Sequence, residues 1–406
     1  MTKPADSEET GRIEALKSLR TTLDWLGDEV HSIQNEVDPV IEMTAITKAF
    51  DGSKALLAEN IKDYPNVHMY SNLYVTPERT AKLFGVHEYK DIKHKILDAY
   101  RNPVPANYVE NSEAPVQETV IPAKDIDRVT DILPIVLHTN EDGGRIFGSG
   151  CHLIGPPWVP DGGNTISMYR MAFRDNQQYA SINMVPGGQG DVVCQRHPGK
   201  KIPVTVNCSQ PVGAELMAVG TLNPVIFPGQ TDKIGMAGAL QDSANDLVKA
   251  KTVDAYAIAQ SEWVMEGYVI EGERVWETDQ AEQLGRQGEA PLHPEWARYM
   301  GRAYRTPRAF DLTAITHRSD KPYYYTPHFG GDLVHHPVRL RVDLRDVSAH
   351  GARLRPGCRR LYRPHHLGRH RRSGEEAEAQ RRRHAAQYHG LDHDRTSRIA
   401  PLRGGR

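Results

Sequence analysis

The protein has 406 residues, of which 25% are charged, and a formal net charge of −2 at pH 7. A chain of this length can bury a large core and is expected to form two or three domains. Its balanced charge argues against a protein that binds polyanions with its whole surface. The sequence has no run of about 18 apolar residues, so we expect neither a membrane span nor a membrane partner.

The start of the chain and its cysteines indicate the compartment. The first ten residues, MTKPADSEET, are acidic and polar, and they lack the basic start and apolar run of a signal peptide. The four cysteines include no CxxC pair, which argues against a zinc site or a disulfide framework. We therefore expect a cytoplasmic protein whose cysteines are buried free thiols.

Residues 1–110 are expected to form a small N-terminal α/β domain. Helical patterns such as IEALKSLRTTLDWLGD occur there together with short apolar pieces such as HMYSNLYV. The segment 102–127 is rich in proline and has no clear period, so we interpret it as a linker or a wrapping segment.

Residues 111–318 are expected to form a second, strand-rich domain. Short strand patterns broken by glycine and proline run through it, and two helical pieces are expected around PVGAELMAV and SANDLVKAKTV. Many short strands at close spacing indicate a barrel or a sandwich-like sheet.

The last part of the chain has an unusual composition. Residues 339–406 contain 18 arginines and no lysine, and they show no apolar period of 2 or 3.6. One interpretation is an arginine-rich arm that binds nucleic acid. The other, which we favour, is a stretch read out of frame from GC-rich DNA, and low apolar content predicts that it is disordered.

One charged residue stands out within the strand-like stretch NTISMYRMAF. Arg170 shares its predicted face with Ile166 and Met168, and an arginine keeps its charge among apolar neighbours because its pKa is too high. Arg170 therefore needs an anion. A protein carboxylate would make it a structural ion pair, whereas a ligand carboxylate or phosphate would make it a functional site.

Six motifs in order carry a resemblance to a known family. They are GRIFGSGCHLI, NTISMYRMAFRDN, GKKIPVTVN, GMAGALQ, EWVMEGYVIEGE and FDLTAITHR. Together they resemble the UbiD family of prenylated-flavin-dependent decarboxylases, nearest the branch that acts on phenolic acids such as protocatechuate. The resemblance covers roughly residues 15–338. It implies an α/β (α+β) fold with an N-terminal α/β domain, a central split β-barrel that holds the flavin, and a C-terminal α/β domain used for oligomerisation.

The resemblance also implies a reaction. It is the reversible, non-oxidative decarboxylation of an aromatic, phenolic or α,β-unsaturated acid with prenylated FMN, which a flavin prenyltransferase supplies. The family motif N-x-x-x-x-R implies that Arg170 is catalytic and pairs with a glutamate. We match that glutamate to Glu295, as partner of Arg170 or proton donor. Some members carry E-x-x-x-x-E at this place, but here Met300 stands five residues after Glu295.

The resemblance further implies a cofactor site with Mn²⁺, and with K⁺ in some members. The expected cofactor-binding residues are Thr165, Ile166, Ser167, Met168, Gln189 and Lys233. The family's metal ligands, asparagine, histidine and glutamate, correspond here to Thr165, Gln189 and Lys233, and none of these is a good replacement as a ligand.

Three interpretations of this departure stay open. Asn164 and Asp232 lie one residue earlier and would serve as ligands if a bulge shifted the strand. Alternatively, the ammonium of Lys233 replaces the charge of the metal beside the flavin phosphate, because lysine is a competent phosphate binder. The third interpretation is a decayed site that no longer binds flavin.

Three functions follow for comparison. The first is a decarboxylase of a small aromatic acid, and the second is an inactive or truncated family member that acts only as a binding or oligomerisation partner. The third is nucleic-acid binding through the arginine-rich tail, which we regard as the weakest. Residues 319–338 would begin the C-terminal domain, but the resemblance ends near Val338, which puts the family's homo-oligomer in question for this chain.

Overall fold

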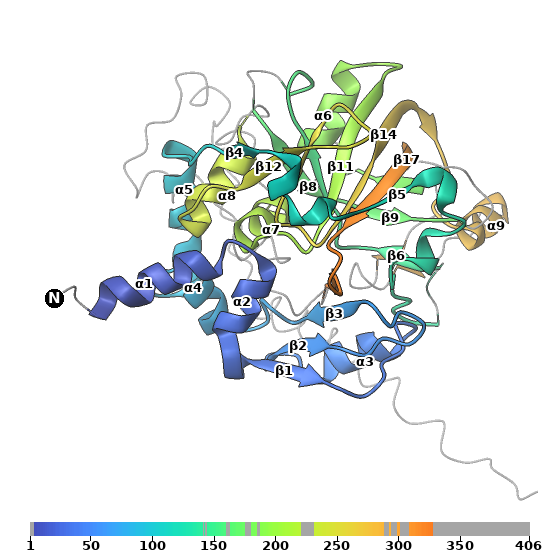
Figure 1. Cartoon of the computed structure of the whole chain (residues 1–406). Helices are drawn as coiled ribbons and strands as arrows, with labels where there is room; N and C mark the ends of the chain where they lie inside the picture. The colour runs from blue at the N-terminus through green and yellow to red at the C-terminus, as the bar shows by residue number, and fades with distance from the viewer. Residues whose placement is uncertain are drawn as a thin grey trace, which may run out of the picture. The chain divides into compact units, whose positions relative to one another are not determined.

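The structure is a computed structural model of the whole chain (Figure 1). It describes residues 4–140, 142, 144–159, 163–174, 180–184, 187–220, 231–287, 292–293, 299–300 and 308–327. The arginine-rich residues 339–406 and Glu295 lie outside the described residues, so the predictions made for them stay predictions. Among the helices that the structure describes, none is both long and apolar enough to cross a membrane.

The N-terminal part combines five helices with three strands. The helices are α1 (Pro4–Ala15), α2 (Leu19–Leu26), α3 (Glu42–Ala49), α4 (Pro77–Leu83) and α5 (Ile92–Arg101), and the strands are β1 (Val30–Ile33), β2 (Ala55–Ala58) and β3 (His68–Ser71). Local sequence sets two of the helix starts. Ser18 Oγ accepts the Thr21 N–H at 3.2 Å before α2, and Thr76 Oγ1 accepts the Arg79 N–H at 3.3 Å before α4.

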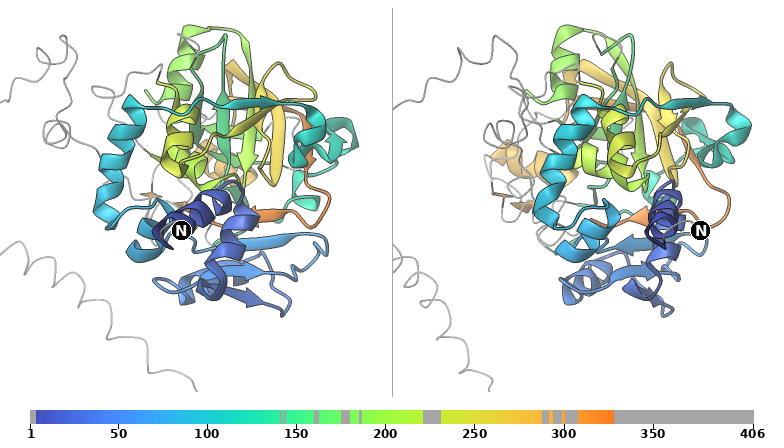
Figure 2. Two further views of the ribbon diagram at one scale, coloured as in Figure 1. Left: turned by 60° about the vertical axis from the view of Figure 1, so that its left-hand side comes forward. Right: turned by 90° about the vertical axis from the view of Figure 1, so that its left-hand side faces the viewer.

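A strand from the far end of the described chain completes the N-terminal sheet. Its order is β1-β2-β3-β18, and β18 (Tyr323–Tyr325) runs parallel to β3. Figure 2 shows this orange strand beside the blue strands. The rings of Tyr70 and Tyr325 stack with their centroids 4.8 Å apart, so aromatic burial fastens residues 323–325 to a sheet built early in the chain.

The centre of the protein is a nine-stranded sheet. Its order is β6-β9-β10-β17-β14-β11-β7-β8, and β5 pairs with β17 off this path. The strands are β5 (Thr119–Pro122), β6 (Ile146–Phe147), β7 (Cys151–Ile154), β8 (Thr165–Met168), β9 (Arg170–Ala172), β10 (Ala180–Asn183), β11 (Lys201–Cys208), β14 (Trp263–Arg274) and β17 (Arg308–His317).

The chain itself connects the two ends of this sheet. Strand β8 lies at one end of the path and β9 lies next to the other end, yet only Tyr169 separates them in sequence. The sheet must therefore curl so that both ends meet at Tyr169, although no hydrogen-bonded strand pair among the described residues closes it into a barrel.

Three helices pack against β8. They are α6 (Gln189–Arg196), α7 (Val212–Val219) and α8 (Lys233–Gln241). The remaining elements are α9 (Asp279–Gln287), β4 (Asn107–Val109), β12 (Asp246–Lys249), β13 (Tyr256–Ile258), β15 (Leu292–His293), β16 (Tyr299–Met300) and the 3₁₀ turns η1 (Gly27–Glu29), η2 (Tyr89–Asp91), η3 (Asn111–Glu113), η4 (Pro115–Gln117), η5 (Ala123–Asp125) and η6 (Val129–Asp131).

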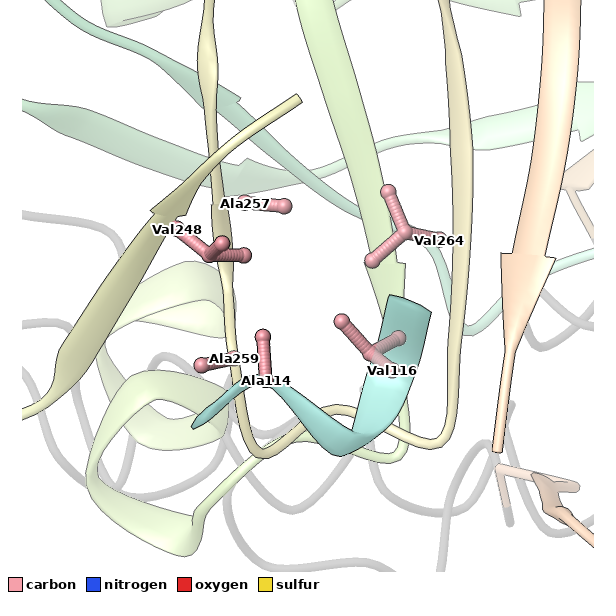
Figure 3. Close-up of a cluster of buried hydrophobic side chains, with 6 residues drawn as sticks. All are labelled: Ala114, Val116, Val248, Ala257, Ala259 and Val264. Carbon is pink, nitrogen blue, oxygen red and sulfur yellow. The ribbon is translucent and has the colours of Figure 1, made fainter. Parts of the chain in front are cut away.

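The proline-rich segment 102–127 is a wrapping segment. Its strand β4 pairs with β12 and its strand β5 pairs with β17. Between these strands, Ala114 and Val116 enter a buried apolar cluster that Val264 of β14 shares, and Figure 3 shows the six side chains of that cluster. Burial of these side chains holds the segment against the sheet.

The structure confirms the mixed α/β class and the helix around PVGAELMAV, which is α7. The helix predicted around SANDLVKAKTV is wrong, because residues 246–249 form strand β12 between β13 and β4. Leu247 and Val248 are both fully buried, on opposite faces of that strand. Backbone pairing and burial on both faces outweigh the weak helical preference of the local sequence.

Candidate functional site

Arg170 and Glu277 form a buried ion pair. Arg170 is the first residue of β9, and its Nη2 donates to Glu277 Oε2 at 3.0 Å while its Nε donates to Glu277 Oε1. The two side chains are 8% and 6% exposed. The anion that Arg170 requires is therefore a protein carboxylate, which is bound bidentately along the Nε–Nη2 edge of the guanidinium.

A cavity is lined by residues that lie close to this pair in the chain, although neither Arg170 nor Glu277 is among its lining residues. Its volume is about 680 Å³, and its walls include Phe173 and Thr278, which are near neighbours of Arg170 and Glu277 in the chain. Tyr64 and Arg145 line it from another side. Sites for small ligands have volumes of roughly 300–1,000 Å³. A small organic molecule can occupy this space, and Glu277 directly precedes its wall residue Thr278 in the chain.

The glutamate that pairs with Arg170 is not the one predicted from the sequence. Glu295 lies outside the described residues, and Glu277 occupies the expected partner's place. Glu277 and Glu282 have the spacing E-x-x-x-x-E, so this motif is present in the chain 18 residues before the position at which we placed it. That spacing was the signal that could have identified Glu277.

The second glutamate of this motif belongs to a different ion-pair network. Glu282 Oε2 lies 2.6 Å from Arg174 Nη2, and Arg174 also pairs with Asp279. Hydrogen bonding from Arg174, followed by that from Arg286, holds the pKa of Glu282 below its usual value. Glu282 is therefore a carboxylate that positions Arg174 at the wall of the cavity.

The predicted cofactor residues come from three elements that meet at β8. Thr165 begins β8, Gln189 begins α6, and Lys233 begins α8. Thr165 Oγ1 donates to Gln189 Oε1 at 2.7 Å, and the Lys233 N–H donates to the carbonyl oxygen of Asn164 at 2.9 Å. Ile166, Ser167 and Met168 continue β8 from this point.

Lys233 is a buried amine that has no hydrogen-bond or ion-pair partner within the described part of the chain. Its exposure is 3%. Burial lowers the pKa of the ammonium to about 7, and the nearby Cys151 thiol opposes that shift only in part. An ionised group in this position is costly unless an anion accompanies it.

The residues at this corner do not fit Mn²⁺. Thr165 and Gln189 already satisfy one another, and a lysine ammonium has no lone pair to donate. The alternative ligands are no better placed, because Asp232 Oδ1 accepts the backbone N–H of Asn164 at 3.3 Å. Asn164 Oδ1 is buried without a partner in the described region, but one amide oxygen does not make a metal site. Among the described residues, no group of three or more histidines, cysteines, aspartates or glutamates could hold a metal ion.

His152 is a further buried titratable group near this corner. It lies opposite Ser167 in the pairing of β7 with β8, and its Nδ1 donates to the Gly150 carbonyl at 3.0 Å. Burial lowers its pKa to about 4. The imidazole is therefore neutral at physiological pH and has a structural place in the sheet.

Family models match most of the chain. Residues 107–331 match the 3-octaprenyl-4-hydroxybenzoate carboxy-lyase Rift-related domain of UbiD, and residues 27–96 match the N-terminal domain of the same carboxy-lyase. These matches confirm the resemblance that the six sequence motifs indicate.

Similar proteins are known by sequence and by structure. A gallate decarboxylase of Lactiplantibacillus plantarum is 27% identical over 334 residues, which cover 74% of this chain and 63% of the relative. An evolved dimeric form of the UbiD-class enzyme HmfF from Pelotomaculum thermopropionicum, in complex with prFMN, has a TM-score of 0.66 and 27% identity, covering 79% of this chain and 69% of that chain. An apo 3,4-dihydroxybenzoic acid decarboxylase from Enterobacter cloacae has a TM-score of 0.66 and 25% identity, covering 78% and 65%.

Proposed function

We propose that this protein, which belongs to the UbiD family of carboxy-lyases, is a non-oxidative decarboxylase of an aromatic or α,β-unsaturated carboxylic acid. The observation that carries the proposal is the buried bidentate pair of Arg170 and Glu277, whose chain neighbours Phe173 and Thr278 line a cavity of about 680 Å³. The chain spans 63% of the length of the gallate decarboxylase that it resembles, so the activity of the whole relative is part of the proposal.

The cofactor of the proposal is prenylated FMN, because a similar solved enzyme is a prFMN complex. When it is bound, this group accepts the electron density that departing CO₂ leaves on carbon. Strand β8 and the first residues of α6 and α8 would hold it, with Thr165, Gln189 and Lys233 at one end and Arg170 beyond the other end of the strand.

Glu277 would deliver the proton that the reaction needs, which it first takes from solvent because it is a carboxylate in its pair with Arg170. The bond between the substrate carbon and its carboxyl carbon breaks, CO₂ leaves, and a proton from a Glu277 oxygen replaces it on the same carbon. Loss of this proton restores the Glu277 carboxylate of the ion pair. Because neither the release of CO₂ nor the protonation of carbon involves a net oxidation, the same groups can also serve the carboxylation direction.

Arg170 would fix the position of Glu277 and of the acid. Its guanidinium holds both oxygens of Glu277, so the carboxyl group has a single orientation toward the reacting carbon. Arg145 also lines the cavity and makes no ion pair with any described residue. Asp63, Asp131 and Asp279 line the same cavity, so its walls carry both signs of charge.

Several finer points belong to the same proposal. They are a cytoplasmic location, cofactor supply by a flavin prenyltransferase, self-association, and a preference for phenolic acids. The main competitor is an inactive family member in which the pair of Arg170 and Glu277 is only structural.

The test is the release of CO₂ by protein produced together with a flavin prenyltransferase. The purified protein should show the visible absorption of a bound flavin and should decarboxylate at least one acid from a panel that includes gallate and 3,4-dihydroxybenzoate. Glu277→Gln should remove this activity and keep the flavin, while Glu273→Gln, which alters an exposed glutamate of β14, should change neither. Flavin-loaded protein that is inactive on every acid would favour the inactive family member.

A further inference from the structure

Two arginines at the two ends of one short stretch bind the same segment of the chain. Arg170 begins β9 and binds Glu277. Arg174, which follows the end of β9 by two residues, binds Asp279 and Glu282. The side chain of Arg174 is 8% exposed. The segment that contains these three carboxylates is therefore fixed to β9 and the residues after it at two separate points.

Arg174 compensates two carboxylates that would otherwise repel each other. Its Nε donates to Asp279 Oδ1 at 2.7 Å, and its Nη2 donates to Glu282 Oε2 at 2.6 Å. Asp279 and Glu282 lie three residues apart in the first turn of α9, and side chains at this spacing are neighbours on one face of a helix. The planar guanidinium fork reaches both at once, so it ties the start of α9 to the end of β9.

The start of α9 determines where the backbone of Glu277 lies. Thr278 Oγ1 accepts the Ala281 N–H at 3.0 Å, and the Thr278 carbonyl accepts the Glu282 N–H at 3.0 Å, so Thr278 caps this helix. A Cβ at Gly144 would lie 3.2 Å from Thr278 Cγ2, which shows how closely the chain packs there. Glu277 directly precedes this capping residue. A displacement of α9 therefore moves the backbone that carries the Glu277 carboxylate.

We propose that Arg174 is a positioning residue of the reaction, which holds Glu277 in its bidentate pair with Arg170 by fixing the start of α9. The inference rests on the proposed function, in which Glu277 delivers the proton to the substrate carbon. Such a transfer needs the two heavy atoms within about 2.6–3.2 Å of each other. A misplacement of about 1 Å can cost roughly 100-fold in rate, so a contact that fixes the segment affects the rate without touching the substrate.

Arg286 provides a matched control on the same carboxylate. Its Nε donates to Glu282 Oε1 at 3.1 Å, but Arg286 lies in the last turn of α9 itself, and its side chain is 70% exposed. An exposed pair within one helix contributes little to stability. Arg286→Met therefore removes a positive charge beside Glu282 and does not release α9 from β9.

The first measurement is the steady-state kinetics of flavin-loaded Arg174→Met. We expect kcat to fall by roughly 100-fold with KM and flavin absorption unchanged. Arg174→Lys should recover only part of this loss, because an ammonium lacks the fork, and Arg286→Met should keep the kcat of the wild type. An Arg174→Met protein with a lower melting temperature and an unchanged kcat would overturn the inference. If Arg174→Met does not fold, an unchanged kcat in Arg174→Lys overturns it instead.

The second measurement reports on the ion pair itself and needs no turnover. In protein labelled with ¹⁵N-arginine, burial and the bond to Glu277 protect the Arg170 Nε–H from exchange with solvent, and loss of the resonance in Arg170→Lys assigns it. We expect this resonance to shift or broaden in Arg174→Met and to stay unchanged in Arg286→Met. An unchanged Arg170 resonance in folded Arg174→Met would also overturn the inference.

The proposed function fails separately from this inference. Flavin-loaded protein that releases no CO₂ from any acid, but in which Arg174→Met alters the Arg170 resonance, would retain the positioning contact and lose the reaction. An active enzyme in which Arg174→Met changes neither kcat nor this resonance would retain the reaction and lose the contact.

Discussion

Arg170 and Glu277 are 107 residues apart in the chain, yet their side chains meet in a buried bidentate ion pair. Arg170 starts β9 immediately after the chain has crossed from one end of the central sheet to the other. Glu277 lies just beyond the end of β14, three positions after Arg274. The curl of the sheet brings these two points together.

The first prediction concerns catalysis by this pair. Arg170→Lys keeps the charge and loses the planar fork, so Glu277 is no longer held in one orientation. We expect kcat/KM to fall by roughly 100-fold, within the range of about 10²–10⁴ that a positioned proton donor contributes. Flavin absorption should be retained. Unchanged turnover in flavin-loaded Arg170→Lys would assign the pair a structural role.

The second prediction concerns stability. Glu277→Gln leaves the Arg170 charge buried without its carboxylate, and removal of one partner of a buried pair typically costs about 3–5 kcal/mol. The double variant Arg170→Met with Glu277→Met removes both charges and should recover most of that loss. Urea unfolding of the wild type, Arg170→Met, Glu277→Met and the double variant measures this coupling. Additive losses would show that the two side chains do not stabilise one another.

The third prediction concerns pH. Burial lowers the pKa of His152 from 6.5 to about 4 in the folded protein. The unfolded chain therefore binds more protons between these values, and the free energy of unfolding falls as the pH drops from 6.5 to 4. Integration over this window gives a loss of about 3 kcal/mol from His152 alone.

The control for this effect is His152→Phe, which has no titratable ring at this position. Urea unfolding at pH 7 and pH 4 should show a smaller loss of stability in the variant than in the wild type. An equal loss in both proteins would mean that His152 is not the group responsible.

The fourth prediction concerns the metal. The triple exchange Thr165→Asn, Gln189→His and Lys233→Glu installs oxygen and nitrogen ligands of the type that a divalent cation accepts. FMN binding by this variant should require Mn²⁺ and should be lost in EDTA, whereas binding by the wild type should not respond to either. Elemental analysis of the two purified proteins gives an independent measure, and one manganese per wild-type chain would contradict the prediction.

Some features of this protein can be predicted from its sequence by local rules. The alternation of short strands with glycine and proline predicts the strand-rich centre, and the apolar run at residues 212–219 predicts α7. The charge of Arg170 among apolar neighbours predicts that an anion lies beside it. Order and spacing of the six motifs identify the family, which the family models confirm.

Other features were decided only by the tertiary structure. Residues 246–249 are a strand because β4 and β13 pair with them from both sides. Glu277 is the partner of Arg170 because the sheet curls at Tyr169, and Lys233 is buried because α8 packs against β8. Local sequence patterns act over a few residues, whereas an ion pair across 107 residues and the burial of one amine depend on how distant strands and helices come together.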